Sequence, residues 1–181
     1  IISRAFKAYS KIMATLLEKI NTQTTIKLSY DDFKNYLSPL IQQCLAEKEV
    51  YLNKIEQQAL EQIAIDELRG LGPLTHLLAD NSLNDILVNK PNQVYVEQAG
   101  TLKPCWLHFR DEQHIIQVVE KIVAMTGKRI NYSTPYINTQ LKDGTRINVI
   151  IPPLAMDSPV ISIRKFPEMA ITLDSMVLNN N

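Results

Sequence analysis

The stretch KDGTRINVIIPP at residues 142–153 decides the fold, together with ISIRKF at residues 161–166. The Asp143-Gly144 pair is typical of a hairpin turn, so the first stretch predicts a strand that begins at Arg146 and stops at a double proline. The second stretch predicts another strand, over residues 160–164. Since strand side chains alternate between two faces, Arg146 and Arg164 lie opposite the isoleucines that face the core. We expect no carboxylate on the strands to pair with these two arginines.

The preceding residues predict the remainder of an α+β domain. Short apolar runs bounded by turn residues predict strands over residues 85–89, 93–97, 102–107 and 136–141. A helix is expected between an N-cap at Asp111 and a C-cap at Gly127. The domain therefore has a mostly antiparallel sheet with helices packed on one side.

The first 70 residues predict two or three helices. An apolar stripe recurs at helical spacing in the first of them and is expected to pack against a neighbouring helix. A second helix is predicted after the capping-box pair Ser29 and Asp32, with a kink at Pro39 or a restart capped by Ser38. A third covers about residues 53–69. The stripe consists of Ile2, Phe6, Tyr9, Met13, Leu16 and Ile20, and the inward positions of the third helix are Ile55, Ala59, Ile63 and Leu68.

Composition excludes several classes of function. The chain has 181 residues, 45% of them hydrophobic, and its 19 basic residues balance its 19 acidic ones. This balance argues against bulk binding to nucleic acid, so we expect no nucleic-acid partner. The two cysteines are distant from each other and predict reduced thiols, and the three histidines lack the spacing of a metal site. Because the sequence begins with Ile and ends in a run of asparagines, we expect a piece of a longer protein.

The two strand arginines allow two interpretations. Most arginines are exposed to solvent, and surface charges account for both on spacing alone. Arginine forks also suit phosphate, which makes an anion site the functional alternative, with Arg129 and Lys165 as weaker additions. The Gly127-Lys128 pair does not complete a phosphate loop, because Ile122 stands where that motif needs glycine and Arg129 where it needs Ser or Thr. A helix C-cap explains Gly127 better.

Several segments, in order, resemble the ATPases of type II secretion, type IV secretion and Flp/Tad pilus assembly, closest to the CpaF branch. They cover about residues 67–178, and each is weak by itself. The resemblance implies boundaries at 1–66 for a helical region, 67–170 for the N-terminal α+β domain of the ATPase and 171–181 for the start of a linker. The segments are GLGPL at 70–74, LLAD at 77–80, DILVN at 85–89, VYVE at 94–97, GKRI at 127–130, DGTRIN at 143–148, PP at 152–153, SIRKF at 162–166 and LDSMV at 173–177.

This resemblance implies a hexameric motor that hydrolyses ATP with Mg²⁺, in which the nucleotide lies between this domain and a RecA-like domain of the same chain. In such proteins the positions that match Arg146, Arg164 and, more weakly, Arg129 reach the nucleotide phosphates. The fragment itself lacks a phosphate loop, so it is expected to be inactive and to bind neither ATP nor Mg²⁺ independently. Partners would be inner-membrane platform proteins, and the location cytoplasmic, peripheral to the bacterial inner membrane.

A second hypothesis needs no motor domain. A sheet with flanking helices can bind a small molecule or a partner helix without catalysis. The chain would then be a standalone sensory or adaptor domain that dimerises through the apolar stripe of its first helix. No catalytic constellation supports a complete enzyme within 181 residues.

Overall fold

The chain folds as two compact units, which meet in sequence at Gly72 and Pro73. The computed structural model describes residues 2–21, 25 and 27–166. We call residues 1–72 the helical unit and the residues from Pro73 onward the sheet unit. Each is described by itself.

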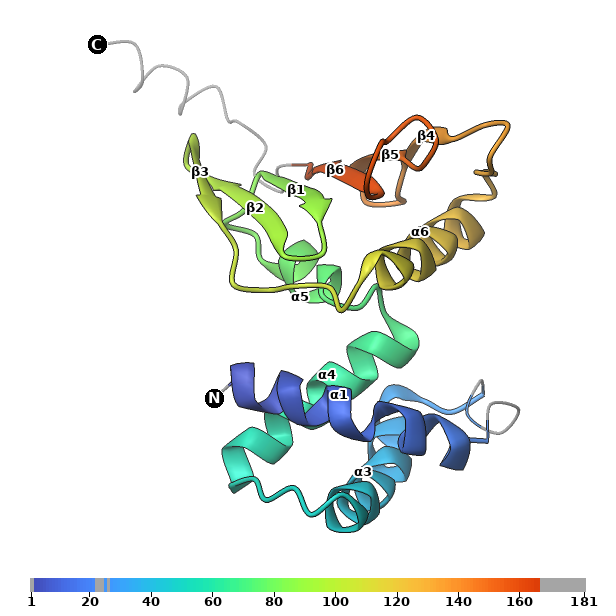
Figure 1. Ribbon diagram of the computed structural model, residues 1–181. Coiled ribbons are helices and arrows are strands. Elements are labelled where there is room, and N and C mark those ends of the chain that lie inside the picture. Colours follow the sequence, from blue (N-terminus) through green and yellow to red (C-terminus); the bar gives the residue numbers. More distant parts are fainter. Residues whose placement is uncertain (1, 22–24, 26, 167–181) are drawn as a thin grey trace. The chain divides into compact units, whose positions relative to one another are not determined.

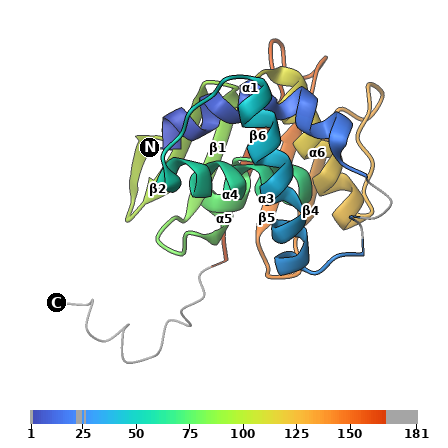
Figure 2. The same ribbon diagram turned by 90° about the horizontal axis from the view of Figure 1, so that it is seen from below.

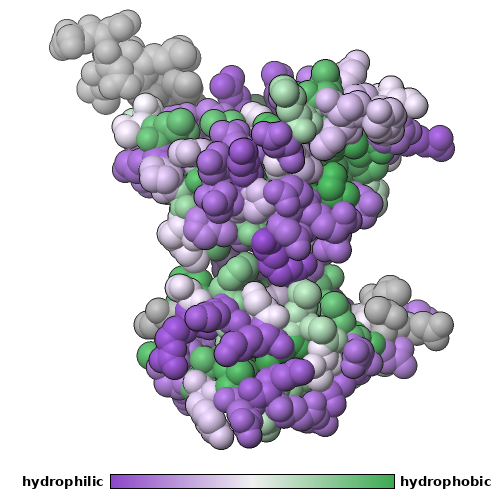
Figure 3. Space-filling view, in the orientation of Figure 1, coloured by the Kyte–Doolittle hydropathy of each residue, from purple (hydrophilic) through white to green (hydrophobic). Residues whose placement is uncertain are grey.

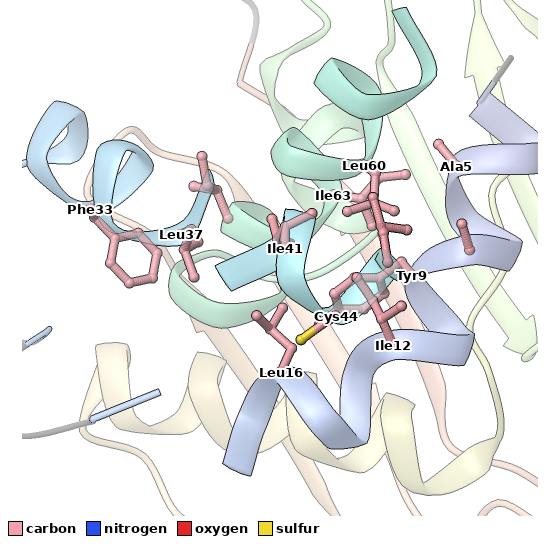
Figure 4. Packing of buried hydrophobic residues seen from close by; sticks show 14 residues of the cluster. Ala5, Tyr9, Ile12, Leu16, Phe33, Leu37, Ile41, Cys44, Leu60 and Ile63 are labelled. Atoms are coloured by element: carbon pink, nitrogen blue, oxygen red, sulfur yellow. The ribbon is translucent and has the colours of Figure 1, made fainter. Parts of the chain in front are cut away.

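Three long helices form the helical unit: α1 (Ile2–Lys19), α3 (Tyr30–Glu47) and α4 (Lys54–Arg69). Helix α1 contacts both of the others, and the three enclose one apolar core (Figure 4). The expected packing of the first helix against neighbouring helices is confirmed. The stripe is covered within the chain itself and is not an open dimer seam. Tyr9 and Leu16 of the stripe are fully buried, as are the neighbouring Ala5 and Ile12, and this face of α1 meets Leu37, Ile41, Cys44 and Leu60.

Side-chain caps fix the starts of α3 and α4. Ser29 Oγ accepts from the backbone N–H of Asp32 at 3.1 Å, as the capping-box spacing predicts. Asn53 and Glu56 form a full capping box, in which each side chain accepts from the other residue's N–H, at 2.9 and 3.0 Å. These bonds satisfy amides that otherwise lack a partner in the first turn.

Two expectations for the helical unit are wrong. Of the two alternatives at Pro39, the restart at Ser38 is wrong: helix α3 continues through Pro39, and Leu37 and Ile41 on either side are buried in the core. The Ser38 hydroxyl instead donates to the Glu61 carboxylate of α4, at 2.7 Å. Ile55 was expected to point inward but is 60% exposed, because the buried face of α4 passes through Leu60 and Ala64.

The sheet unit contains one six-stranded sheet in the order β3-β2-β1-β6-β5-β4, and every neighbouring pair is antiparallel (Figure 1). The strand predicted over residues 102–107 is shorter and covers Thr101–Pro104, followed by one further bond from the Cys105 N–H to the Val94 carbonyl at 2.7 Å. The other strands agree with the prediction to within a residue or two. The elements of this unit are α5 (Leu74–Ala79), β1 (Asp85–Lys90), β2 (Gln93–Gln98), β3 (Thr101–Pro104), α6 (Glu112–Thr126), β4 (Tyr136–Gln140), β5 (Arg146–Ile150) and β6 (Val160–Arg164).

Helices α5 and α6 cover one face of the sheet, which we call the inner face (Figures 1 and 2). The predicted α+β fold with helices on one side is confirmed. The core lies between this face and α6, and the alternating strand residues point to the opposite, outer face. Core residues from the strands are Ile86, Val88, Val94, Ile137, Ile147, Val149, Ile161 and Ile163, and those from α6 are Ile115, Val118, Val119 and Ile122.

The surface of both units is a mixture of hydrophilic and smaller hydrophobic areas (Figure 3). None of the helices in the described part of the chain is long and apolar enough to cross a membrane.

Candidate functional site

The outer face of the sheet carries a row of five polar side chains, each directly opposite the next on a neighbouring strand. In order across the sheet they are Gln140, Arg146, Arg164, Asp85 and Glu97. We call this set the charged row. It brings together the two arginines predicted from sequence as an anion site, and it adds two carboxylates that were not predicted to be there.

The β4–β5 turn sets the register that places Arg146 in the row. Gly144 adopts a φ of +90°, which an L side chain rarely tolerates. Asp143 Oδ1 accepts from the Thr145 N–H at 2.9 Å, and Gln140 Nε2 donates to the Gly144 carbonyl at 3.0 Å. The turn therefore fixes where β5 begins, and Arg146 is its first residue.

Arg164 is paired, contrary to the expectation that no strand carboxylate meets the arginines. Its Nε donates to Asp85 Oδ1 at 3.1 Å, and the two residues are directly opposite on β6 and β1. The Arg164 side chain is 77% exposed, whereas that of Asp85 is 24% exposed. The sequence could not show this pair, because β1 and β6 are 79 residues apart at this point and their pairing is a property of the sheet topology.

Glu97 extends the negative end of the row. The Asn84 side chain donates to Glu97 Oε1 at 3.2 Å and the Gly100 N–H at 2.8 Å. Hydrogen bonds from the Asn84 side chain and the Gly100 N–H, aided by the positive charge of Arg164, hold the pKa of Glu97 below its usual range. Glu97 is therefore ionised at neutral pH, and the row carries two positive charges followed by two negative ones.

Arg146 is the positive charge without an internal counter-charge. Its side chain is exposed, and no hydrogen bond or ion pair engages it within the residues that the structure describes. Like charges directly opposite on neighbouring strands are unfavourable by roughly 0.2–1 kcal/mol. Because Asp85 compensates Arg164 only, the Arg146 end of the row remains positive.

Arg129 lies outside the row. Gly127 closes α6 in the left-handed conformation, with φ +66°, which confirms the C-cap interpretation of the Gly127-Lys128 pair. Lys128 and Arg129 follow this cap and are exposed. The structure does not place Arg129 on a strand of the sheet, so it shares no register with Arg146 or Arg164.

Lys165 and Phe166, the two residues that follow Arg164, hold the end of β6 in place. Sequence reasoning missed the role of both. Lys165 Nζ donates to the carbonyl oxygens of Leu77, at 3.4 Å, and of Asp80, and so caps the C-terminal end of α5. The Phe166 ring lies against Gly144, where an added Cβ would be 3.1 Å from its Cγ. The two strand ends that carry Arg146 and Arg164 are thus held from outside the ladder.

A cavity of about 440 Å³ lies between the C-terminal end of α6 and the β4–β5 hairpin. Gln140 belongs both to its lining and to the charged row. The other lining residues are Met125, Thr126, Leu141, Lys142 and Asp143. Among the described residues no group of three or more His, Cys, Asp or Glu side chains could hold a metal ion.

Comparison with known protein families assigns the chain to one of them. The family model described as Type II/IV secretion system protein matches residues 67–180, well over half of the sequence. The chain belongs to this family. The match includes all six strands of the sheet and every member of the charged row.

Individual members of the secretion system family show moderate similarity. A Mycobacterium tuberculosis protein named for conjugal transfer is 27% identical over 54% of this chain and 30% of its own length. The type IV secretion system protein VirB11 of Bartonella quintana is 26% identical over 60% of the chain and 31% of its own length. The crystal structure of the VirB11 ATPase of Brucella suis, in complex with sulphate, is 25% identical, with a TM-score of 0.52 over 60% of this chain and 34% of that one. The chain spans about a third of the length of these relatives.

Proposed function

We propose that the sheet unit is the N-terminal domain of a secretion or pilus-assembly ATPase, in which Arg146 and Arg164 bind the phosphates of the nucleotide. The single observation that supports this best is the register that sets the two arginines directly opposite each other on the outer face of the sheet. Family membership and the similarity to the VirB11 ATPase support the wider assignment.

The chemistry of the row suits a phosphate chain better than a single small anion. Directly opposite residues on antiparallel strands have Cβ atoms about 4.5–5.5 Å apart, so two long guanidinium side chains can converge on one phosphate or bridge two. Guanidinium groups bind phosphate oxygens in a bidentate way. The related Brucella suis structure contains sulphate, a tetrahedral anion of similar size to phosphate.

The further parts of the proposal concern the complete protein. A RecA-like domain C-terminal to this chain would carry the phosphate loop and bind ATP with Mg²⁺, and the protein would assemble as a hexamer. Arginines that contact the terminal phosphate would make closure of the two domains depend on whether that phosphate is present, which is how a nucleotide shifts a conformational equilibrium. We place the protein in the CpaF branch of Flp/Tad pilus assembly, at the cytoplasmic side of the inner membrane with platform proteins as partners, on the segments quoted from its sequence.

Triphosphate binding tests the role of the arginines. Inorganic triphosphate, which tests the pair of arginines alone and not the binding of ATP, is titrated into the 181-residue chain at low salt and followed by NMR. Arg146→Ala and Arg164→Ala each lose a charge-assisted contact, so each is expected to weaken binding about tenfold or more. Arg110→Ala, an arginine of the same unit that hydrogen-bonds Gln117 and lies outside the row, is the matched control. In the complete protein both variants are expected to reduce ATP hydrolysis without changing the fold.

The proposal fails if triphosphate binds the two variants and the control with the same affinity. It also fails if both arginine variants of the complete protein hydrolyse ATP at the rate of the unchanged protein.

A further inference from the structure

We infer that Asp85 is a positioning residue for Arg164: its carboxylate holds the guanidinium by Nε and turns the two terminal nitrogens outward for a phosphate ligand. This inference rests on the proposed function and adds a residue to its site. The contact that suggests it is the 3.1 Å bond between Arg164 Nε and Asp85 Oδ1.

The bond uses only one of the five N–H donors of Arg164. The four donors on Nη1 and Nη2 form no hydrogen bond with the part of the chain that the structure describes. They form the end of the guanidinium fork that matches a phosphate in a bidentate way. Asp85 and a phosphate can therefore bind Arg164 together, on different edges of the same planar group.

Asp85 is itself held more firmly than the side chain that it orients. It lies at the start of β1, a strand that is hydrogen-bonded to β2 on one side and β6 on the other. Backbone bonds of the adjacent Asn84 tie this end of the strand on both sides: its N–H donates to the Glu97 carbonyl at 2.9 Å, and its carbonyl accepts from the Lys165 N–H at 2.8 Å. The backbone at Asp85 is therefore held within the sheet, and the Asp85 side chain is far less exposed than that of Arg164.

The two arginines thus differ in whether their side chains are oriented before a ligand binds. Arg164 is pre-oriented by Asp85, whereas Arg146 has no partner in the described structure and must be ordered by the ligand itself. A guanidinium fixed in advance loses less side-chain freedom when the phosphate binds. The opposite effect also exists, because the negative charge of Asp85 repels an anion.

Two variants separate orientation from repulsion. Asp85→Asn keeps an oxygen that can accept from Nε but removes the charge, whereas Asp85→Ala removes both. Affinity for inorganic triphosphate is measured on the 181-residue chain for each, alone and combined with Arg164→Ala. Asp157→Ala is the charge-matched control. Asp157 lies in the connection between β5 and β6, at the ends of these two strands that are opposite to Arg146 and Arg164, and its carboxylate pairs with Lys90 at 3.9 Å.

Orientation predicts that Asp85→Ala binds triphosphate about threefold to tenfold more weakly than Asp85→Asn, the loss of one net hydrogen bond. In the Arg164→Ala background the two Asp85 variants should bind equally, because the effect acts through Arg164. If Asp85→Ala binds as tightly as Asp85→Asn, or more tightly, Asp85 does not orient Arg164 and the inference is overturned.

This outcome is distinct from failure of the proposed function, in which Arg146→Ala and Arg164→Ala themselves leave triphosphate binding unchanged.

Hydrogen exchange of the side-chain Nε–H groups gives a test that needs no Asp85 variant. In the unchanged chain we expect the Arg164 Nε–H to exchange more slowly than that of Arg146, and equal rates would overturn the inference.

Discussion

At the scale of single residues, Gly144 links the turn of a hairpin to the end of another strand. Its φ of +90° is required by the turn, and the Phe166 ring occupies the space where a side chain would begin. Gly127 has a similar φ of +66°, but nothing lies within 4 Å of the position of an added Cβ. The two glycines therefore separate the cost of backbone strain from the cost of a steric clash.

Gly144→Ala is expected to destabilise the chain more than Gly127→Ala. Both substitutions force an L residue into left-handed backbone, at about 1–2 kcal/mol each, and Gly144→Ala adds the clash with Phe166. Thermal unfolding of the two variants measures the difference. Combining Gly144→Ala with Phe166→Ala should remove the steric part only. Equal destabilisation by the two glycine variants would show that Phe166 does not pack on the turn.

At the scale of elements, the sequence predicted the strands, the helix ends and the β4–β5 hairpin, but not which strands that are distant in the chain pair with each other. The Asp143-Gly144 turn, the Asp111 cap and the Gly127 cap are local signals, and each stands where it was expected. The Arg164–Asp85 pair depends on β6 lying beside β1, a contact between residues far apart in the chain. A close pair of arginines could thus be predicted from alternation, but the carboxylate that orients one of them could not.

The same local signals make the capping box of α4 testable. Asn53→Ala removes the side-chain acceptor for the Glu56 N–H and is expected to cost about 0.5–2 kcal/mol of stability. Asn53→Asp keeps an acceptor at the helix N-terminus and should be close to neutral. Urea unfolding followed by circular dichroism measures both. If Asn53→Ala is as stable as Asn53→Asp, the cap does not contribute to the stability of the helix.

At the scale of the whole molecule, the chain consists of two units with separate cores. Most of the helical stripe predicted from sequence packs against the core, but the buried face differs from it by about one position: Ile12, which was not predicted, is fully buried, and Ile2, which was, is 42% exposed. Periodicity identifies a helical face to within about one position, whereas the neighbours α3 and α4 decide which residues on that face are covered. The charged row lies wholly within the sheet unit.

This division predicts that stability and anion binding can be changed separately. Leu60→Ala opens a cavity in the fully buried core of the helical unit and is expected to destabilise that unit by about 2–5 kcal/mol. Triphosphate affinity of the folded chain should remain as it was, because no member of the row belongs to the helical unit. Calorimetry and the triphosphate titration, carried out on the same sample, test both expectations. A lower affinity in folded Leu60→Ala protein would contradict the separation.

The hydrogen bonds from Lys165 to the end of α5 affect how β6 responds to a pulling force. Strand β6 lies in the interior of the sheet, bonded to β5 on one side and β1 on the other. A pull along the chain that continues from Phe166 therefore meets the Lys165 anchor first and then loads both ladders in shear, so that many hydrogen bonds share the tension at once. Arg164 lies on this strand, one residue before the anchor.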